Sequence, residues 1–505
     1  MLKRLVFALT AFVLLLIVAE TTARLIESGA ARRAQESTDM SGWQEKFFGS
    51  IFDWHEPDPY LLWRFKPNLD NQYIQTNSEH TIGPEVNTTK RPIEFRVLLL
   101  GDSSPVGLGL ESYLLAFGER LRLRLQEWYG GNRDVQLINA AVAGYSSEQI
   151  VCYLDRYGWR FAPDLVILYC GNNDASISGF SHDRELMQHQ RWRRLRALMS
   201  RLAIYRVLRA ALASDRQPAV ADASQLKVRV TPDQFEENLR TIARQCHRRN
   251  CPLTIVKPPV PLLWPAGLQF KPFSHLTGSD GQLVLPPALA AGLDQPIRYC
   301  LDRDRLPDRF EKVDKFTRSV YHSAYWDSLT PDEAVEFYRR KLVEDPQSPI
   351  LLNNLGVACW ERGDYPEANR YLRAARSEHS HEAQDRPNQA IFSLGSVFLF
   401  NIGVNLLSAA AAAGDSSAID TAFAYLDSAL QADFLSLRVK RAYLDRIDKV
   451  AGAFDNVTVI DGQALFARNG GEKLFIDHCH PTAKGHQLLA DDLCAAITGD
   501  KVGDR

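Results

Sequence analysis

The chain has 505 residues, enough for two or three domains of average size, and its net charge at pH 7 is only −2. Nucleic-acid-binding domains tend to be strongly basic, so this charge balance argues against a nucleic-acid partner. The eight cysteines form no C-x-x-C pairs or zinc-spaced clusters with histidine, so we expect no metal and no other cofactor. Cys246 and Cys251 are close enough for a disulfide in an oxidising compartment, although buried free thiols are the commoner outcome.

The N-terminus predicts a membrane-targeting helix. Lys3 and Arg4 precede an almost purely apolar run over residues 5–18. This run is shorter than the roughly 20 residues that span a bilayer, which favours a cleaved signal peptide. However, no clean A-x-A cleavage site follows it, which favours an anchor. We therefore expect residues 1–24 to be an uncleaved signal anchor, with secretion after cleavage as the alternative. Because the basic residues come first, the rest of the chain is expected to be extracytoplasmic, in the periplasm.

Residues 25–92 are interpreted as a stalk and lead-in. Aromatic residues such as Trp54, Tyr60 and Trp63 alternate there with prolines and aspartates, without a long period of either helical or strand type. We expect irregular structure and edge strands packed against the main domain.

The first clear element is a buried strand followed by a glycine turn. The unbroken apolar run Val97–Leu100 predicts a strand buried on both faces, as in a parallel sheet. Gly101, Asp102 and Ser103 follow at once, which places a hydroxyl group at the edge where open α/β sheets bind ligands. A serine held there can be a nucleophile if a base reaches it. The alternative is an ordinary turn with a helix N-cap.

Helices and strands then alternate. In chain order we expect a helix over 113–128, a strand over 135–138, a helix over 147–160, a strand over 165–169, a helix over 233–248 and a strand over 253–257. Leu114, Leu121 and Leu125 share one face of the first helix, and the turns after the next two strands contain Gly144 and Asn173. Repeated β-turn-α units in one direction predict a parallel sheet with helices on both faces.

Two stretches are less regular. Residues 184–209 are rich in arginine, with leucines at helical spacing. We interpret them as an amphipathic surface helix, or alternatively as a helix on an anionic membrane surface or a lid over the site. Residues 262–330 have a loop-rich pattern to which no element is assigned.

From about residue 331 to 432 the pattern changes to successive helices. Leu355, Gly356, Ala368 and Leu372 are among the residues that occupy the offsets of a helix–turn–helix repeat, and this unit resembles a tetratricopeptide repeat. A poorer copy begins at Ile402. Two units are fewer than such arrays usually need, so we expect the preceding helix and the host domain to complete the core. The alternative is a helical insert without repeat ancestry.

The α/β pattern returns after residue 437. A helix to about residue 454 precedes a strand over 457–460, and the motif Asp477-His-Cys-His480-Pro is followed by a last helix over 485–497. The helical block is therefore expected to be an insertion within one domain.

Four strand-end turns now carry Ser103, Gly144, Asn173 and the pair Asp477 and His480. Ester hydrolysis needs a hydroxyl nucleophile, a base, a carboxylate to orient that base, and donors for the oxyanion. In this order the turns resemble the four blocks of the SGNH, or GDSL-type, hydrolases, a family of serine esterases and acylhydrolases. The matching residues are Gly101-Asp102-Ser103 with Gly107, then Gly144, then Gly171-Asn172-Asn173-Asp174 (G-x-N-D), and Asp477 to Pro481 (D-x-x-H-P).

The resemblance implies a three-layer α/β/α fold with a parallel, flavodoxin-like sheet. It implies that Ser103 is the nucleophile, that His480 is the base and that Asp477 orients it. The oxyanion hole is then formed by the backbone N–H groups of Ser103 and Gly144 with the side-chain amide of Asn173.

Neighbouring residues offer alternatives. Ser104 competes with Ser103 as nucleophile, but the motif register favours Ser103. We expect His478 and His486 to be polar surface or cap residues, and Cys479 to be a packed thiol.

The resemblance covers about residues 95–260 and 438–497. The lead-in also resembles membrane-anchored bacterial members of the family, through Asp58-Pro-Tyr-Leu-Leu-Trp63 and Lys66-Pro-Asn68. The expected organisation is an anchor (1–24), a stalk and lead-in (25–92), a first hydrolase part (93–325), a helical insertion (326–434) and a second hydrolase part (435–505).

These observations predict a membrane-tethered serine esterase that hydrolyses an O-acyl ester of a carbohydrate or lipid through an acyl-enzyme. One alternative is an acyltransferase with the same residues, in which a sugar hydroxyl of an extracytoplasmic polysaccharide replaces water. Another is a scaffold whose helical repeat binds a partner protein.

Overall fold

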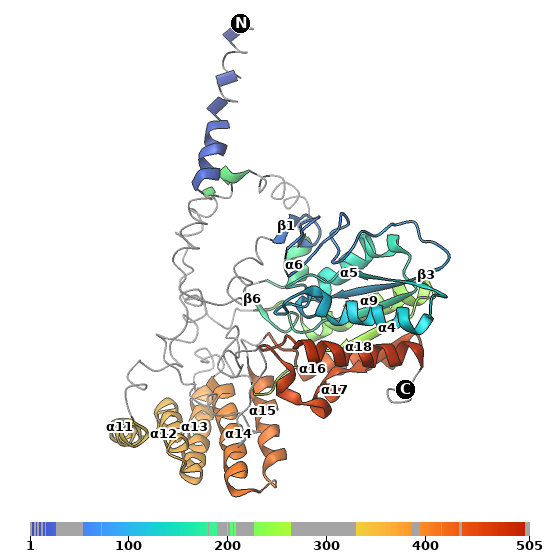
Figure 1. Ribbon diagram of the computed structural model, residues 1–505. Helices are drawn as coiled ribbons and strands as arrows, with labels where there is room; N and C mark the ends of the chain where they lie inside the picture. The colour runs from blue at the N-terminus through green and yellow to red at the C-terminus, as the bar shows by residue number, and fades with distance from the viewer. Residues whose placement is uncertain are drawn as a thin grey trace.

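The computed structural model describes residues 54–71, 73–179, 181–188, 227–263, 330–385, 394–415, 417–433 and 437–499, with parts of a helix within 3–26 and several residues from 199 to 208 (Figure 1). Residues 27–53 of the predicted stalk and lead-in, most of the arginine-rich stretch and nearly all of the loop-rich stretch 262–330 lie outside the described residues.

The centre of the fold is a parallel sheet with the strand order β4-β3-β5-β8-β9. Its strands are β3 (Glu94–Gly101), β4 (Asp134–Asn139), β5 (Leu165–Tyr169), β8 (Leu253–Lys257) and β9 (Val457–Asp461). The chain adds β4 on one side of β3 and the later strands on the other. This 2-1-3-4-5 order is that of flavodoxin-like sheets, in which ligands bind at the carboxyl edge where the order reverses, between β3 and β5.

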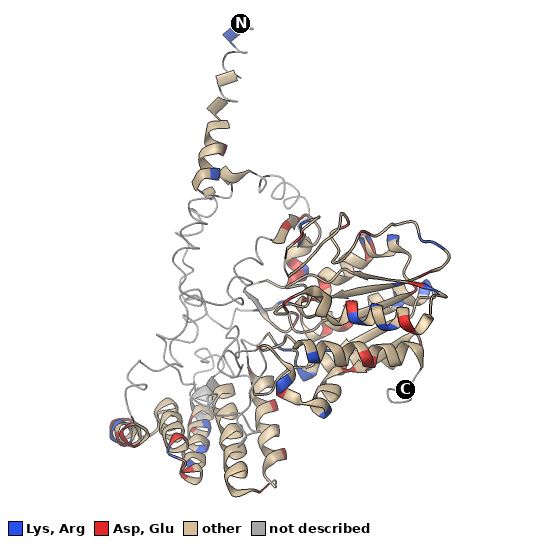
Figure 2. Cartoon of the chain, viewed as in Figure 1, with Lys and Arg blue, Asp and Glu red and all other residues tan. Residues whose placement is uncertain are grey.

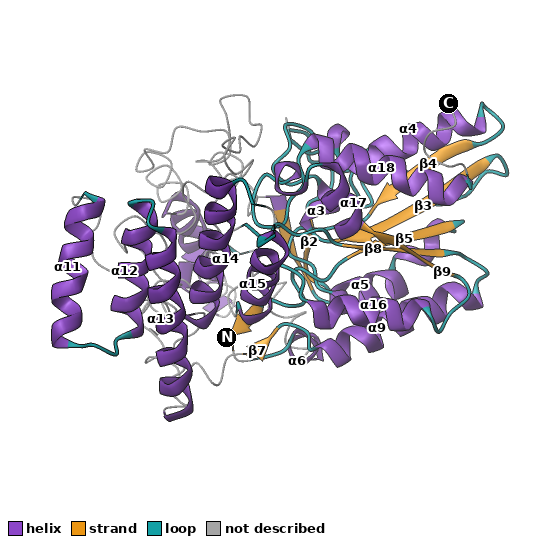
Figure 3. Cartoon of the chain, turned by 90° about the horizontal axis from the view of Figure 1, so that it is seen from below, coloured by secondary structure: helices purple, strands orange, loops and turns teal. Residues whose placement is uncertain are grey.

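The apolar run of β3 is buried because both faces of the sheet are covered. Leu98 and Leu100 pack into one hydrophobic core, and Val97 and Leu99 pack into the other. Figure 3 shows the two helical layers. One layer contains α4 (Phe117–Tyr129), α17 (Gly462–Asn469) and α18 (Ala483–Thr498), and the other contains α5 (Ser147–Arg156), α9 (Pro232–Arg248) and α16 (Arg441–Ala451). The predicted parallel sheet with helices on both faces is confirmed.

Short elements connect these layers at the two edges of the sheet. They are α3 (Ser103–Val106), η2 (Tyr113–Leu115), η3 (Gly158–Phe161), β6 (Ile177–Gly179), α6 (Asp183–Gln188), β7 (Lys227–Val228) and η10 (Gly471–Leu474). Cys246 and Cys251 are buried free thiols rather than a disulfide.

The helix predicted over 113–128 is shorter than expected. Ala116 is extended and separates η2 from α4, which begins only at residue 117. As a result Leu114 is 52% exposed, whereas Leu121 and Leu125 are fully buried. The prediction that all three leucines share one face of a single helix was therefore wrong for Leu114, which lies in η2.

The lead-in forms its own small sheet. Strands β1 (His55–Asp58) and β2 (Leu62–Phe65) pair antiparallel and do not join the parallel sheet. Leu61 and Phe65 are buried in the same core as one face of β3. The N–H of Ile82 donates to Asn139 at the end of β4, so this segment is attached to the carboxyl edge of the sheet.

A block of helices stands beside the sheet (Figure 1). It consists of α11 (Pro331–Glu344), α12 (Pro349–Glu361), α13 (Tyr365–Asp385), α14 (Leu394–Ala413) and α15 (Ile419–Ala432). Helix α14 has no charged residue (Figure 2), and by length and composition alone it could cross a membrane. However, 72% of its apolar window is buried inside the protein, which is typical of a core helix.

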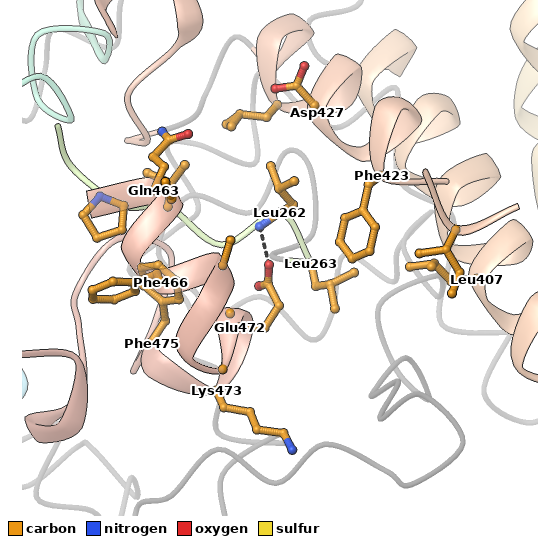
Figure 4. A pocket seen from close by; sticks show the side chains of 18 of the residues that line it. Leu262, Leu263, Leu407, Phe423, Asp427, Gln463, Phe466, Glu472, Lys473 and Phe475 are labelled. Carbon is orange, nitrogen blue, oxygen red and sulfur yellow. Dashed lines mark hydrogen bonds between the residues drawn. The ribbon is translucent and has the colours of Figure 1, made fainter. Parts of the chain in front are cut away.

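A groove of about 1160 Å³ lies between the helical block and the sheet domain (Figure 4). Leu407 and Phe423 line it from α14 and α15, and Phe466 and Phe475 line it from the opposite side. On its floor the Glu472 carboxylate accepts a hydrogen bond of 2.7 Å from the N–H of Leu262.

The turn after β3 has no space for a side chain at Gly101. A Cβ there would lie 2.6 Å from both Pro105 Cγ and the backbone oxygen of Tyr169. We expect Gly101→Ala to lower the free energy of unfolding by about 1–3 kcal/mol, because β3 would have to move away from β5. In Gly452→Ala the nearest atom is 3.5 Å away, so this control should change stability by less than about 0.5 kcal/mol. Equal midpoints in urea for the two variants would contradict the prediction.

Candidate catalytic site

Ser103 is the first residue of α3 and directly follows β3. The Asp102 carboxylate caps this short helix by accepting the N–H of Ser104 at 3.0 Å. Gly107 ends the helix with φ +82°, and its N–H donates to the carbonyl of Ser104. The turn is closed by short-range bonds at both ends, so the Ser103 side chain has a defined position at the carboxyl edge of the sheet.

Ser103, His480 and Asp477 form a chain of hydrogen bonds. The Ser103 Oγ lies 2.7 Å from His480 Nε2, and His480 Nδ1 lies 2.7 and 2.9 Å from the two Asp477 carboxylate oxygens. With the Nδ1 proton directed at Asp477, Nε2 is free to accept the proton of Ser103. This is the arrangement needed to activate a serine as a nucleophile.

A single loop holds both the histidine and the aspartate. Asp477 Oδ1 also accepts the backbone N–H groups of Cys479 and His480, at 3.0 and 2.9 Å. The N–H of Ile476 donates to the carbonyl of His480, which closes the loop on itself. The carboxylate therefore fixes the loop backbone as well as the imidazole.

Charge and burial act in opposite directions on this pair. Burial alone would raise the pKa of Asp477, but the nearby histidines and the hydrogen bonds it accepts hold that pKa well below its usual range. Burial alone would lower the pKa of His480, but the charge and hydrogen bonding of Asp477 raise it above the ordinary value of 6.5. The carboxylate thus stabilises the imidazolium that forms when His480 accepts a proton.

The competing nucleophiles have other partners. The Ser104 hydroxyl is buried and donates to the carbonyl of Cys479 at 3.3 Å, which links the serine turn to the histidine loop. The Cys479 sulfur lies 3.8 Å from His480 Nδ1, but burial raises the pKa of this thiol well above 9. A thiol that stays protonated is a poor nucleophile, so the geometry favours Ser103.

The two neighbouring histidines were predicted to be polar surface or cap residues, and the surface alternative was wrong for both. His478 is 6% exposed and His486 is fully buried. Burial lowers the pKa of His478 to about 4 and that of His486 to about 3, so both are neutral at pH 7. His486 stacks on Phe117 and its Nδ1 accepts the Phe117 N–H at 3.1 Å, so it connects α18 to the start of α4.

The turn after β4 lies beside the serine turn. The N–H groups of Ala140 and Val142 donate to Leu99 and Gly101 of β3, which extends the strand pairing into the turn. Gly144 then has φ +81°, a conformation that favours glycine. Within the described part of the chain, the N–H groups of Ser103 and Gly144 donate no hydrogen bond. Both groups are available for an oxyanion.

Asn173 is attached to the same turn. Its side-chain Nδ2 donates to the carbonyl of Tyr145 at 3.1 Å, and the second hydrogen of this amide can serve a ligand. The adjacent Asn172 accepts the N–H of Val439 at 2.9 Å, and the buried Asp174 accepts the N–H of Ser147 at the start of α5. Sequence reasoning assigned no role to Asn172 or Asp174, although both belong to the G-x-N-D block.

No family model matches the sequence, and no curated protein matches it. Solved structures similar to the chain include TesA, with 18% sequence identity over 33% of this chain and 62% of that chain and a TM-score of 0.21. LAE5, an α/β hydrolase enzyme from the metagenome of Lake Arreo, Spain, is 11% identical over 81% of this chain and 97% of that chain, with a TM-score of 0.31. AlinE4, an SGNH-hydrolase family esterase, is 20% identical over 33% of this chain and 60% of that chain, with a TM-score of 0.19.

The chain thus spans less than two thirds of the TesA and AlinE4 chains.

The charge pair at the site predicts the titration of His480. Its imidazole should titrate above pH 6.5, because the neighbouring carboxylate favours the protonated form. In Asp477→Asn that charge is lost while burial remains, so the pKa should fall below 6.5. NMR titration of the imidazole signals measures both values. In the control Asp491→Asn, on the surface of α18, His480 should titrate as in the wild type. A pKa that Asp477→Asn leaves unchanged would contradict the prediction.

Proposed function

We propose that the protein is a serine esterase that hydrolyses an O-acyl ester through an acyl-enzyme. The observation that carries this proposal is the hydrogen-bonded chain from Ser103 through His480 to Asp477. It lies at the carboxyl edge of the sheet, near the backbone N–H groups of Ser103 and Gly144, which donate no hydrogen bond to any described residue.

In the first half-reaction, Ser103 Oγ attacks the acyl carbonyl carbon while its proton moves to His480 Nε2. The carbonyl oxygen becomes an oxyanion and receives hydrogen bonds from the N–H groups of Ser103 and Gly144 and from the Asn173 amide. The tetrahedral intermediate then collapses, the bond to the alcohol breaks, and His480 gives its proton to the leaving oxygen. Asp477 remains a carboxylate throughout and stabilises the imidazolium.

In the second half-reaction, water attacks the acyl-enzyme and loses a proton to His480. Collapse of this intermediate releases the acid and returns the proton to Ser103. Residues of this chain supply every group that the steps require. With a sugar hydroxyl in place of water, the same steps would transfer the acyl group to a carbohydrate.

Two further assignments belong to this proposal. The first is that the esterase is of the SGNH type, and the second is that its helical block is a tetratricopeptide-like insertion. The convergence of Ser103, Gly144 and Asn173 after β3, β4 and β5 with the Asp477–His480 loop supports the first. For the second, a Cβ on Gly356 would lie 2.7 Å from Leu372, and a Cβ on Gly403 would lie 2.8 Å from Leu426. The same glycine-to-leucine helix contact therefore occurs in α12–α13 and in α14–α15, as expected of two repeat units.

We also propose that the N-terminal helix anchors the protein in a membrane, with the catalytic part outside the cytoplasm. Its described apolar side chains are unusually exposed, including Phe7 at 76%, Leu15 at 67% and Val18 at 64%. Large apolar side chains that no described part of the chain covers are suited to lipid.

The serine assignment predicts the effect of two neighbouring substitutions. Ser103→Ala should reduce turnover of short- and medium-chain aryl esters by about 10³-fold or more, because the nucleophile is lost. Ser104→Ala should keep most of the activity, because it loses one hydrogen bond between the serine turn and the histidine loop but leaves the nucleophile and the base in place. Retained turnover in Ser103→Ala would remove Ser103 from this role. The same assay with a carbohydrate acceptor would identify an acyltransferase by its acylated product.

The oxyanion hole predicts a separate kinetic signature. Asn173→Ala should lower kcat by about 10²–10³-fold with a smaller change in KM, because the oxyanion forms only near the transition state. Steady-state kinetics on the same esters measures both constants. A change confined to KM would show that Asn173 binds the substrate in its ground state instead.

A further inference from the structure

The turn that carries Gly144 is held at three successive carbonyl groups. The indole N–H of Trp63 donates to Ala143 at 3.0 Å, and the Arg229 guanidinium donates to Gly144 at 2.6 Å. The Asn173 amide donates to Tyr145 at 3.1 Å. These side chains come from β2, from the segment after β7 and from the loop after β5, so three distant segments converge on one turn.

The bond from Trp63 has a direct geometric consequence. The carbonyl of Ala143 and the N–H of Gly144 belong to the same peptide group, which is planar and trans. The N–H therefore points away from the carbonyl, and whatever fixes the oxygen also fixes the direction of the N–H. A carbonyl that accepts a hydrogen bond also polarises its amide, which makes the Gly144 N–H a stronger donor.

The indole itself is locked in place. A Cβ on Gly144 would lie only 3.2 Å from Trp63 Cζ2, so the indole edge packs directly against the glycine. The Tyr145 ring meets the indole edge-on at 5.9 Å, and the Tyr145 hydroxyl donates to the backbone oxygen of Trp63 at 2.7 Å. Trp63 and the turn thus hold each other through two reciprocal hydrogen bonds.

Arg229 secures the next peptide group, between Gly144 and Tyr145. Its guanidinium also binds the buried Asp183 at 2.7 Å and Gln149 at 3.0 Å, and it lies 5.8 Å from the Trp63 ring. Glycine is the residue whose backbone changes conformation most easily. Holding the peptide groups on both sides of Gly144 prevents the rotation that would turn its N–H away.

We propose that Trp63 is a positioning residue of the oxyanion hole, which aims the Gly144 N–H through the Ala143–Gly144 peptide. This inference rests on the proposed esterase function. By this inference the lead-in hairpin of β1 and β2 contributes a positioning residue to the site and does not only connect it to the stalk.

The test compares two tryptophan-to-phenylalanine variants of the full chain. Trp63→Phe keeps an aromatic ring but loses the N–H donor. We expect kcat to fall about tenfold or more with KM near the wild-type value, which is less than the roughly 10²–10³-fold loss on removal of a donor. The affinity for a boronic acid, which forms a tetrahedral adduct with Ser103 Oγ, should fall by the same factor as kcat/KM.

The matched control is Trp159→Phe. Trp159 lies in η3, away from the four turns of the site, and its indole N–H donates to Gln245 at 2.7 Å. This variant should lower the melting temperature but leave kcat, KM and boronic acid affinity unchanged. If Trp63→Phe behaves like this control, the positioning role is wrong.

If the proposed esterase function itself is wrong, the kinetic result differs from both outcomes above. In that case the wild type itself shows no turnover that depends on Ser103. Crystal structures of wild type and Trp63→Phe then decide the inference. A reoriented Ala143–Gly144 peptide in the variant supports it, and an unchanged peptide overturns it.

Discussion

The contact between Ser103 Oγ and His480 Nε2 joins residues 377 positions apart in the sequence. It depends on the surrounding structure, which fixes the position of each residue. The serine end is fixed by β3, which is buried on both faces and closed by the Asp102 cap. The histidine end is fixed by Asp477, which binds two backbone N–H groups of its own loop. Ser104 then ties the two ends together through the carbonyl of Cys479.

The helical block can be inserted without disturbing this contact because of where it interrupts the sheet. The chain leaves after β8 and returns before β9, and these strands are neighbours paired from Leu253 with Val457 to Lys257 with Asp461. The sheet is therefore continuous across the insertion. Phe475, which lines the groove between the helical block and the sheet domain, is two residues before Asp477. None of the described lining residues is Ser103, Asp477 or His480.

Three nearby histidines are equally buried but have different electrostatic properties, because their partners differ. His478 and His486 have lowered pKa values and remain neutral, so they can be packed in the interior without a charge. His480 differs because Asp477 lies within hydrogen-bond distance of its Nδ1, and its pKa is raised despite the same burial. In the proposed mechanism, proton transfer is therefore assigned to the imidazole that faces Ser103.

The sequence by itself determined the strands and the residues at their ends. The runs over 165–169 and 253–257 were predicted with the bounds they have, because strands buried on both faces are nearly continuous apolar runs. Only the tertiary structure decided the exposure of Leu114, the burial of His486 and the bond from Trp63 to the turn at Gly144. Each depends on which distant segment packs against the residue, and a local pattern contains no information about that partner.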